Sequence, residues 1–180
     1  CIHHSCTLAT QTGRNAHRGP NLGQVVSAPW ARELFVPFPG HQMVGCDLEG
    51  LELRALGHYL HRFDEGAFAE VVVNGDIHQQ NADRVGCTRK EVKTICYAFI
   101  YGAGDQKLGH SLRPELSDSQ KKQLGSELRR KFLDAIPGLE PLIEAVKQRV
   151  RTNNRLRGLD GRPIFCRAEH ASLNYLLQSC

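Results

Sequence analysis

The feature that most constrains this chain is a helix with recognisable signals at both ends. Thr88 is followed three residues later by Glu91, the capping-box pattern in which each side chain satisfies a free backbone donor of the other residue. Beyond Tyr101, the sequence Gly102-Ala103-Gly104 offers the left-handed exit that glycine adopts without strain. The sequence therefore predicts one helix from Thr88 to Tyr101.

The remaining elements are one short apolar run and several segments of helical periodicity. The first 40 residues are rich in glycine and proline and predict loops. The run His41–Cys46 predicts a buried strand that ends at Asp47. Further helices are expected at 51–60, 67–73, 77–85, 117–134, 140–152 and 168–178, with a turn into a strand within 158–165. This order indicates an α+β fold with a dominant helical insertion.

Composition restricts the class of protein. Of the 180 residues, 41% are hydrophobic and 23% charged, as in ordinary globular domains, and no apolar run approaches the roughly 20 residues that span a bilayer. There is no secretory leader, and the seven cysteines form no CxxC pair. We expect a soluble, cytoplasmic protein without a membrane partner. The net charge of +4 permits nucleic-acid binding, and basic residues concentrate in Lys147–Arg167.

Four polar residues form a stripe on the helix that begins at Thr88. Arg89, Lys93, Tyr97 and Tyr101 are spaced four apart, so they wind slowly along one face for roughly 18 Å. Two cations at the helix start followed by two aromatic rings have the polarity of a nucleoside triphosphate. The alternative is an exposed basic turn followed by core tyrosines, and the spacing alone does not separate the two.

Asp47 is the second chemical feature. A carboxylate at the end of a buried strand is held rigidly, which suits a hard cation such as Mg²⁺. Two-metal phosphoryl transfer needs carboxylates that bridge both metal ions. One metal ion activates a hydroxyl, and the other stabilises the leaving group. An aspartate in front of a helix is also a common N-cap, and this alternative stays open.

Together these patterns resemble family A DNA polymerases. The pattern Arg-x3-Lys-x3-Tyr-x3-Tyr-Gly, from Arg89 on, resembles the nucleotide-binding helix of their fingers, and Asp-x4-Glu-Leu-Arg, from Asp47 on, resembles their palm motif. Tyr97 is typical of phage members, whereas bacterial repair enzymes generally have Phe. The resemblance implies a podophage-type replicative DNA polymerase. Its parts would be a partial palm of short antiparallel strands (1–60), helical fingers (61–155, with the nucleotide-binding helix at 88–101) and a return toward the palm (156–180).

The resemblance assigns roles around the incoming nucleotide. Asp47, Arg89 and Lys93 would be catalytic, and Asp47 with the Leu48 carbonyl would hold metal in a site for two Mg²⁺ ions. Glu52 would exclude the ribose 2′-hydroxyl by a clash. The stretch Gly75-Asp76-Ile77-His78 resembles the segment whose histidine contacts phosphate. The dNTP-binding set is therefore His78, Arg89, Lys93, Tyr97, Tyr101 and Glu52. Glu49 departs from the small residue usual at its position.

Other segments resemble the family's contacts with primer-template DNA. Arg14 and Gln24 would reach the minor groove or backbone of the nascent duplex, where contacts test pair geometry without reading sequence. Asn174 and Gln178, four apart on one helix face, would contact the template. Ala16 and Val25-Val26 depart from the family pattern. The implied partners are primer-template DNA and dNTPs, with room for a processivity factor.

Two rival functions and one expected absence complete the interpretation. The family's last motif, a His-Asp-Glu hairpin with a second metal carboxylate, is expected after Gln178 and is not in the sequence, so we expect these 180 residues alone not to extend a primer. A single-subunit RNA polymerase would share the basic-and-tyrosine helix but lack Glu52. A non-catalytic nucleic-acid-binding remnant would use Lys147–Arg167 and have no need of Asp47, Arg89 and Lys93.

Overall fold

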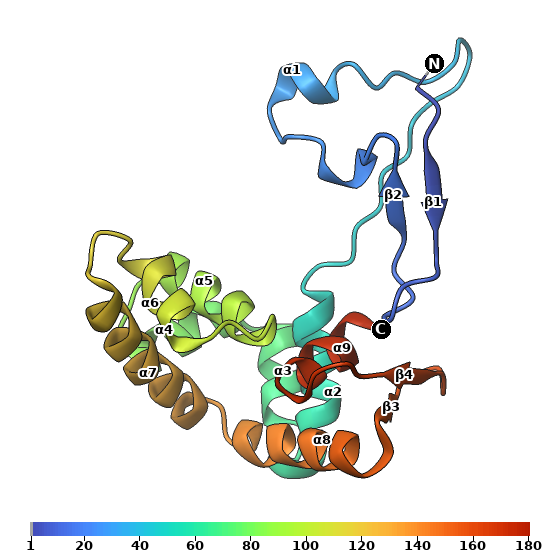
Figure 1. The fold of residues 1–180 in the computed structure, drawn as a ribbon. Helices are drawn as coiled ribbons and strands as arrows, with labels where there is room; N and C mark the ends of the chain where they lie inside the picture. The colour runs from blue at the N-terminus through green and yellow to red at the C-terminus, as the bar shows by residue number, and fades with distance from the viewer. Residues whose placement is uncertain (1) are drawn as a thin grey trace. The chain divides into compact units, whose positions relative to one another are not determined.

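A computed structural model describes residues 2–180, which form two compact units (Figure 1). The N-terminal unit extends to Glu49, and the helical unit runs from Gly50 to Cys180. The predicted subdivision at residues 60 and 155 is a functional one and stays a prediction. Within the described part of the chain, no helix has both the length and the apolarity needed to cross a bilayer.

The N-terminal unit consists of short elements joined by long extended segments. Strand β1 (Ser5–Thr7) pairs antiparallel with β2 (Ala16–Arg18), and Cys6 lies opposite His17. A 3-10 helix η1 (Leu22–Gln24) and a one-turn helix α1 (Pro29–Arg32) follow. The glycines and prolines from which we predicted loops do not prevent these short strands and helices. Among the residues described in this unit, Ala31 is the one buried hydrophobic side chain, so the unit has almost no core of its own.

The predicted strand at His41–Cys46 is wrong. The segment is extended without regular secondary structure, and the side chains of Met43 and Val44 are 63% and 91% exposed. A strand requires a neighbour to accept and donate backbone hydrogen bonds. In residues 2–180, β1 pairs with β2 and β3 with β4, and neither sheet extends to this run. Apolar character alone therefore did not produce a strand.

The helical unit contains eight α-helices, one 3-10 helix and a hairpin within the described residues. The helices are α2 (Leu51–Asp64), α3 (Ala67–Asn74), α4 (Ile77–Val85), α5 (Arg89–Ile100), α6 (Asp105–Leu112), α7 (Asp118–Ala135), α8 (Leu139–Asn153) and α9 (Ser172–Gln178), with η2 (Glu169–Ala171) before α9. Strands β3 (Arg155–Arg157) and β4 (Pro163–Phe165) form the antiparallel hairpin. The predicted α+β class is confirmed, as are the predicted helices. The sequence patterns did not reveal α6 or β3.

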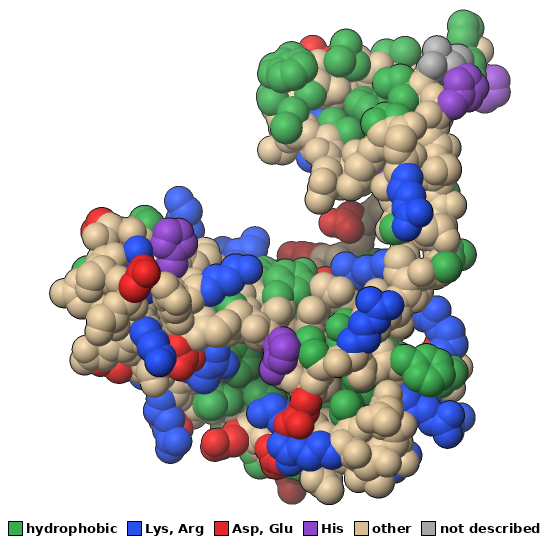
Figure 2. Space-filling model, viewed as in Figure 1, with side chains coloured by type: hydrophobic (Ala, Val, Ile, Leu, Met, Phe, Trp, Pro, Cys, Tyr) green, Lys and Arg blue, Asp and Glu red, His purple; other side chains and the backbone are tan. Residues whose placement is uncertain are grey.

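One continuous apolar core joins these helices. Leu56, Ile95 and Phe132 are fully buried within it, and the rings of Phe99 and Phe132 lie 5.0 Å apart. Helices α6 and α7 cross so closely that a Cβ at Gly125 would collide with the carbonyl of Asp105. On the face of this unit shown in Figure 2, basic and acidic side chains are interspersed.

Helix α5 forms as its terminal signals predict. The Thr88 hydroxyl accepts a hydrogen bond from the Glu91 amide, and the Glu91 carboxylate accepts one from the Thr88 amide at 3.0 Å. At the other end, Gly102 has φ of 75°, the left-handed conformation that lets the chain leave the helix. Residues Val92, Ile95, Cys96 and Phe99 face the core, which fixes the orientation of the opposite face.

Candidate nucleotide-binding site

The stripe of four residues lies on the solvent side of α5. Arg89 and Lys93 are exposed, Tyr97 is half-buried, and Tyr101 directly follows the helix and is 45% exposed. The Tyr97 and Tyr101 rings are stacked, with centroids 6.3 Å apart and planes inclined by 26°. Burial raises the pKa of Tyr97, whose phenol is therefore neutral at physiological pH. The tyrosines are thus not core residues, and they present ring surface on the same helix face as the cations.

His78 comes from α4 and stands beside this stripe. Asp76 caps α4 by accepting hydrogen bonds from the amides of His78 and Gln79, which sets the direction of the first turn. The ring centroid of His78 lies 6.1 Å from that of Tyr97. Burial is the main cause that lowers the pKa of His78, and the nearby charges of Lys93 and Arg89 lower it further. The imidazole is therefore neutral at pH 7 and can donate one hydrogen bond.

Glu52 reaches the other end of the stripe from α2. Gly50 has φ of 60° and starts this helix, so Glu52 lies in the first helical turn. The Tyr101 hydroxyl donates a hydrogen bond to the Glu52 Oε1 atom at 3.3 Å. The negative charge of Glu52 also contributes to the raised pKa of Tyr97. A carboxylate thus stands at the aromatic end of the stripe, opposite in position to the cations.

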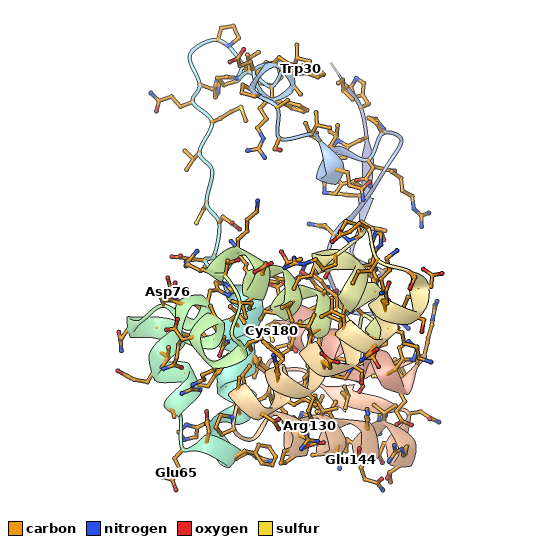
Figure 3. The ribbon with its side chains drawn as sticks, turned by 90° about the vertical axis from the view of Figure 1, so that its left-hand side faces the viewer. Trp30, Glu65, Asp76, Arg130, Glu144 and Cys180 are labelled. Carbon is orange, nitrogen blue, oxygen red and sulfur yellow. The ribbon has the colours of Figure 1, made fainter. Side chains whose placement is uncertain are left out.

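At the cationic end, Arg89 forms an ion pair. Its Nε atom donates to the Oδ2 atom of Asp76 at 2.7 Å, and about half of each side chain is exposed. The Arg89 hydrogen bond is the main cause that lowers the pKa of Asp76, so this carboxyl is ionised at neutral pH. Asp76, labelled in Figure 3, lies at the start of α4 and thereby links the histidine helix to the stripe helix.

The structure therefore brings together all six residues predicted to bind dNTP. Two cations and a neutral imidazole lie at one end of α5, two stacked phenol rings lie further along it, and a carboxylate lies next to the last ring. The six residues are His78, Arg89, Lys93, Tyr97, Tyr101 and Glu52. This arrangement can neutralise a multiply charged group at one end and stack against a flat ring at the other.

The predicted metal and duplex residues of the first segment belong to the N-terminal unit. Arg14, Gln24, Asp47 and Leu48 are all exposed there, and Gln24 ends η1. The carboxylate and the backbone carbonyl that were predicted to bind metal are oxygen donors of the type that Mg²⁺ prefers. In residues 2–180, however, no three His, Cys, Asp or Glu side chains converge as a metal site. The oxygens of Asp47 and Leu48 thus fit Mg²⁺ only as part of a donor set.

Asn174 and Gln178 lie on α9, as expected. Asn174 is half-buried, and its Oδ1 atom is buried without a hydrogen-bond partner in the described part of the chain. Near this helix, Arg162 donates to the Ser179 carbonyl at 3.2 Å, which ties the β3–β4 turn to the end of α9. An unsatisfied amide oxygen is costly in the folded chain. Because this oxygen is buried, the predicted contact of Asn174 with the template stays a prediction.

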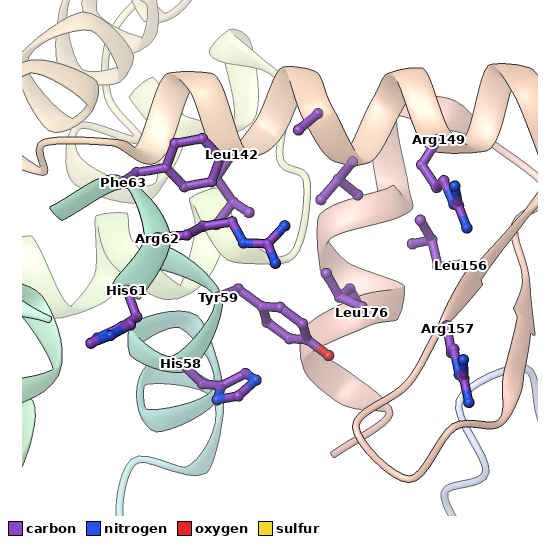
Figure 4. Close-up of a pocket in the computed structure, with 12 residues that line it drawn as sticks. His58, Tyr59, His61, Arg62, Phe63, Leu142, Arg149, Leu156, Arg157 and Leu176 are labelled. Carbon is purple, nitrogen blue, oxygen red and sulfur yellow. The ribbon is translucent and has the colours of Figure 1, made fainter. Parts of the chain in front are cut away.

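A cavity of about 600 Å³ lies elsewhere in the helical unit (Figure 4). Its lining is mostly apolar and includes Arg62, Arg149 and Arg157. Burial raises the pKa of Tyr59, which lines it, to about 12. None of the predicted site residues lines this cavity, and no sequence signal indicated it. The cavity draws residues from α2, α8, β3 and α9, which come together only in the folded chain.

The fold places this chain in a known class of protein. It superposes on the POL domain of Pol1 from M. smegmatis, solved in complex with DNA primer-template and dNTP, with a TM-score of 0.75 and 20% sequence identity. The superposition covers 99% of this chain and 35% of that one. At this level of identity the likeness concerns the fold, which is that of a polymerase domain.

Sequence comparisons show the family. Residues 1–178 match the profile of DNA polymerase family A. The DNA-directed DNA polymerases of Escherichia phage T7 and Enterobacteria phage T3 are each 36% identical over 93% of this chain. DNA polymerase theta of Caenorhabditis elegans is 27% identical over 98% of it. This chain belongs to DNA polymerase family A. It spans 27% of the length of the T7 and T3 relatives.

Proposed function

We propose that this chain supplies the nucleotide-binding part of a DNA-directed DNA polymerase, and that the incoming dNTP lies along α5. The observation that carries the proposal is the convergence of Arg89, Lys93 and His78 at one end of α5 with stacked Tyr97 and Tyr101 at the other. Family membership is consistent with it, because the phage relatives are DNA-directed DNA polymerases.

The phosphates would bind at the start of α5. Arg89 offers a planar guanidinium and Lys93 a point charge, and both neutralise the negative charge that phosphoryl transfer redistributes. His78, neutral at pH 7, would donate to a phosphate oxygen without adding to the net charge. The first-turn amides of α5 add the positive end of the helix dipole. These groups hold the triphosphate in one orientation, which is the chief protein contribution to this reaction.

The sugar and base would bind at the other end. Tyr97 provides a ring surface for the sugar and base, and Tyr101 stacks behind it. Glu52, oriented by the hydrogen bond from Tyr101, would occupy the space that a ribose 2′-hydroxyl requires. The carboxylate thereby selects deoxyribose, which distinguishes this function from that of a single-subunit RNA polymerase.

Metal and duplex contacts would come from the other predicted residues. The oxygens of Asp47 and Leu48 would form part of the set that holds two Mg²⁺ ions. Bound Mg²⁺ would supply activation of the primer 3′-hydroxyl and neutralisation of the departing pyrophosphate. Asp47 precedes Glu52 by five residues, so the chain keeps their Cα atoms within about 18 Å. Arg14, Gln24, Asn174 and Gln178 would contact primer-template DNA. The phage relatives further suggest a bacterial or phage-infected cytoplasm as its location.

A titration of the 180-residue chain tests the nucleotide site. In buffer with Mg²⁺, calorimetric titration with dATP should show binding that Lys93→Ala weakens by about tenfold, because a hydrogen bond to a charged group is lost. Lys90→Ala is the matched control. Lys90 is exposed on the same helix but lies off the stripe. Its loss should change the dissociation constant by less than about twofold, since a screened surface charge contributes little.

The same titration separates the rival functions. ATP should bind more weakly than dATP, and Glu52→Ala should reduce that difference. Equal binding of ATP and dATP by the unmodified chain would favour the RNA polymerase alternative. Equal losses of dATP affinity from Lys93→Ala and Lys90→Ala would show that α5 is not a nucleotide-binding site and would favour a nucleic-acid-binding remnant.

A further inference from the structure

Asp76 uses its two carboxylate oxygens for different tasks. The Oδ1 atom accepts hydrogen bonds from the amides of His78 and Gln79, at 3.1 and 3.0 Å, and thereby caps α4. The Oδ2 atom holds the Nε atom of Arg89 on the neighbouring helix at 2.7 Å. One oxygen therefore serves the fold, whereas the other binds a cation that the proposed function assigns to a phosphate group.

The position of Arg89 determines which phosphate that would be. Arg89 is the first residue of α5, one turn before Lys93 and two turns before Tyr97. At about 1.5 Å of rise per residue, Arg89 stands about 12 Å from Tyr97 along the axis and Lys93 about 6 Å. A nucleotide whose base stacks near Tyr97 thus meets Lys93 first. Only the phosphate farthest from the base extends to Arg89.

We infer that Asp76 is a placeholder for the terminal phosphate of the incoming nucleotide and lowers the affinity of the site for triphosphates alone. The inference rests on the proposed function of α5. Before binding, the Asp76 carboxylate occupies the guanidinium of Arg89; when a triphosphate arrives, Arg89 exchanges one oxyanion for another. Both side chains are about half exposed, so water screens the pair and the exchange meets a low barrier.

The exchange distinguishes nucleotides by the number of their phosphates. A triphosphate can take Arg89 from Asp76 because its terminal group is at the right distance and carries more charge than one carboxylate. A diphosphate ends near Lys93 and leaves the Arg89–Asp76 pair intact. Asp76 therefore weakens the binding of every ligand that needs Arg89, and it has little effect on ligands that do not reach this side chain. Its effect on affinity is thus specific to the triphosphate.

Asp76→Asn separates the two tasks of this side chain. Asparagine is as good an N-cap as aspartate, so its amide oxygen keeps the cap of α4, while the loss of charge breaks the pair with Arg89. Calorimetric titrations at about 0.15 M salt, where charges beyond roughly 8 Å are screened, should show dATP bound about three- to fivefold more tightly than by the unmodified chain. The dissociation constant for dADP should change by less than about 1.5-fold.

Three further variants make the result specific. Asp83→Asn removes an exposed carboxylate from the same helix, one that accepts from Gln79 at 2.8 Å, and should leave dATP affinity unchanged. In an Arg89→Ala background, Asp76→Asn should have no effect on dATP binding. Asp76→Ser, which also caps helices, should reproduce the gain if Asp76→Asn does not fold.

The outcomes distinguish a failure of the Asp76 inference from a failure of the proposed nucleotide site on α5. Unchanged or weaker dATP binding by Asp76→Asn, or an equal gain for dADP, would overturn the placeholder role if Lys93→Ala still weakens binding. If Lys93→Ala has no effect beyond that of Lys90→Ala, the nucleotide site itself is wrong. A gain that persists in the Arg89→Ala background would show general charge repulsion, which also overturns the exchange.

Discussion

The N-terminal unit and the helical unit differ most in where they keep their apolar side chains. The helical unit buries them in one core, and its larger helices each contribute one face. The N-terminal unit exposes most of its large hydrophobic residues: Ile2, Leu8, Val26, Trp30, Leu34, Phe35, Val36, Phe38, Met43, Val44 and Leu48. The helical unit therefore has the packing of a stable domain, whereas the described residues of the N-terminal unit leave most of their large apolar side chains uncovered.

The difference follows from the kinds of element in each unit. An α-helix satisfies its backbone hydrogen bonds within one segment and needs a neighbour only for its apolar stripe. An extended segment needs a neighbour for both. In the helical unit the neighbours are provided by adjacent helices, but in the N-terminal unit a pair of three-residue strands and two short helical turns provide few. Stability should therefore reside in residues 50–180.

The largest expected effect comes from emptying the helical core. Phe132 is fully buried against Phe99, so Phe132→Ala should lower the free energy of unfolding by about 3–5 kcal/mol. Phe38→Ala is the matched change in the N-terminal unit, where this ring is 73% exposed, and it should stay within about 0.5 kcal/mol. Urea denaturation followed by circular dichroism measures both. A comparable loss from Phe38→Ala would show that the N-terminal unit is packed in solution.

A pair of glycines gives the next largest effect. Gly125→Ala places a methyl group against the Asp105 carbonyl where α6 crosses α7, which should cost about 2–3 kcal/mol despite the better helix propensity of alanine. Gly45→Ala meets no atom within 4 Å, and Gly45 is not among the glycines with positive φ, so no loss is expected. Denaturation midpoints of the two variants test this. Equal midpoints would mean that the crossing of α6 and α7 relaxes.

How much the sequence predicts also differs between the units. In the helical unit, caps such as Thr88–Glu91 and apolar periodicity act over one helix, and every helix predicted from them is present. Helix α6 was missed because its large apolar residues are only Leu108 and Leu112, and Gly109 between them disfavours a helix. At His41–Cys46 the apolar run resembled a strand, but a strand depends on a partner that periodicity cannot reveal.

The candidate site shows the same division. The stripe from Arg89 to Tyr101 follows from spacing alone, because one helix carries it. The contact of Tyr101 with Glu52 and the pair of Arg89 with Asp76 join residues on different helices, and no local pattern predicts them. The cavity that Arg62 lines is formed by four elements, and the sequence did not predict it for the same reason.

The smallest effect tests local order within the helical unit through pH. Hydrogen bonds from the Thr88 amide and hydroxyl, then from Arg113, lower the pKa of Glu91 from 4.5 to about 2. A carboxyl with a depressed pKa stabilises the fold above its unfolded pKa, and this contribution is lost as the pH falls from about 4.5 to about 2. Glu91→Gln keeps an N3 residue suited to the capping box but removes the charge. The melting temperature of the variant should lie below that of the unmodified chain by a degree or two at pH 6, and the two should converge near pH 2.

Arg113→Gln, which removes one of the hydrogen bonds, should give part of the same convergence. A difference that is constant from pH 6 to pH 2 would assign the loss to packing, and the capping box would then contribute no charge-dependent order to α5.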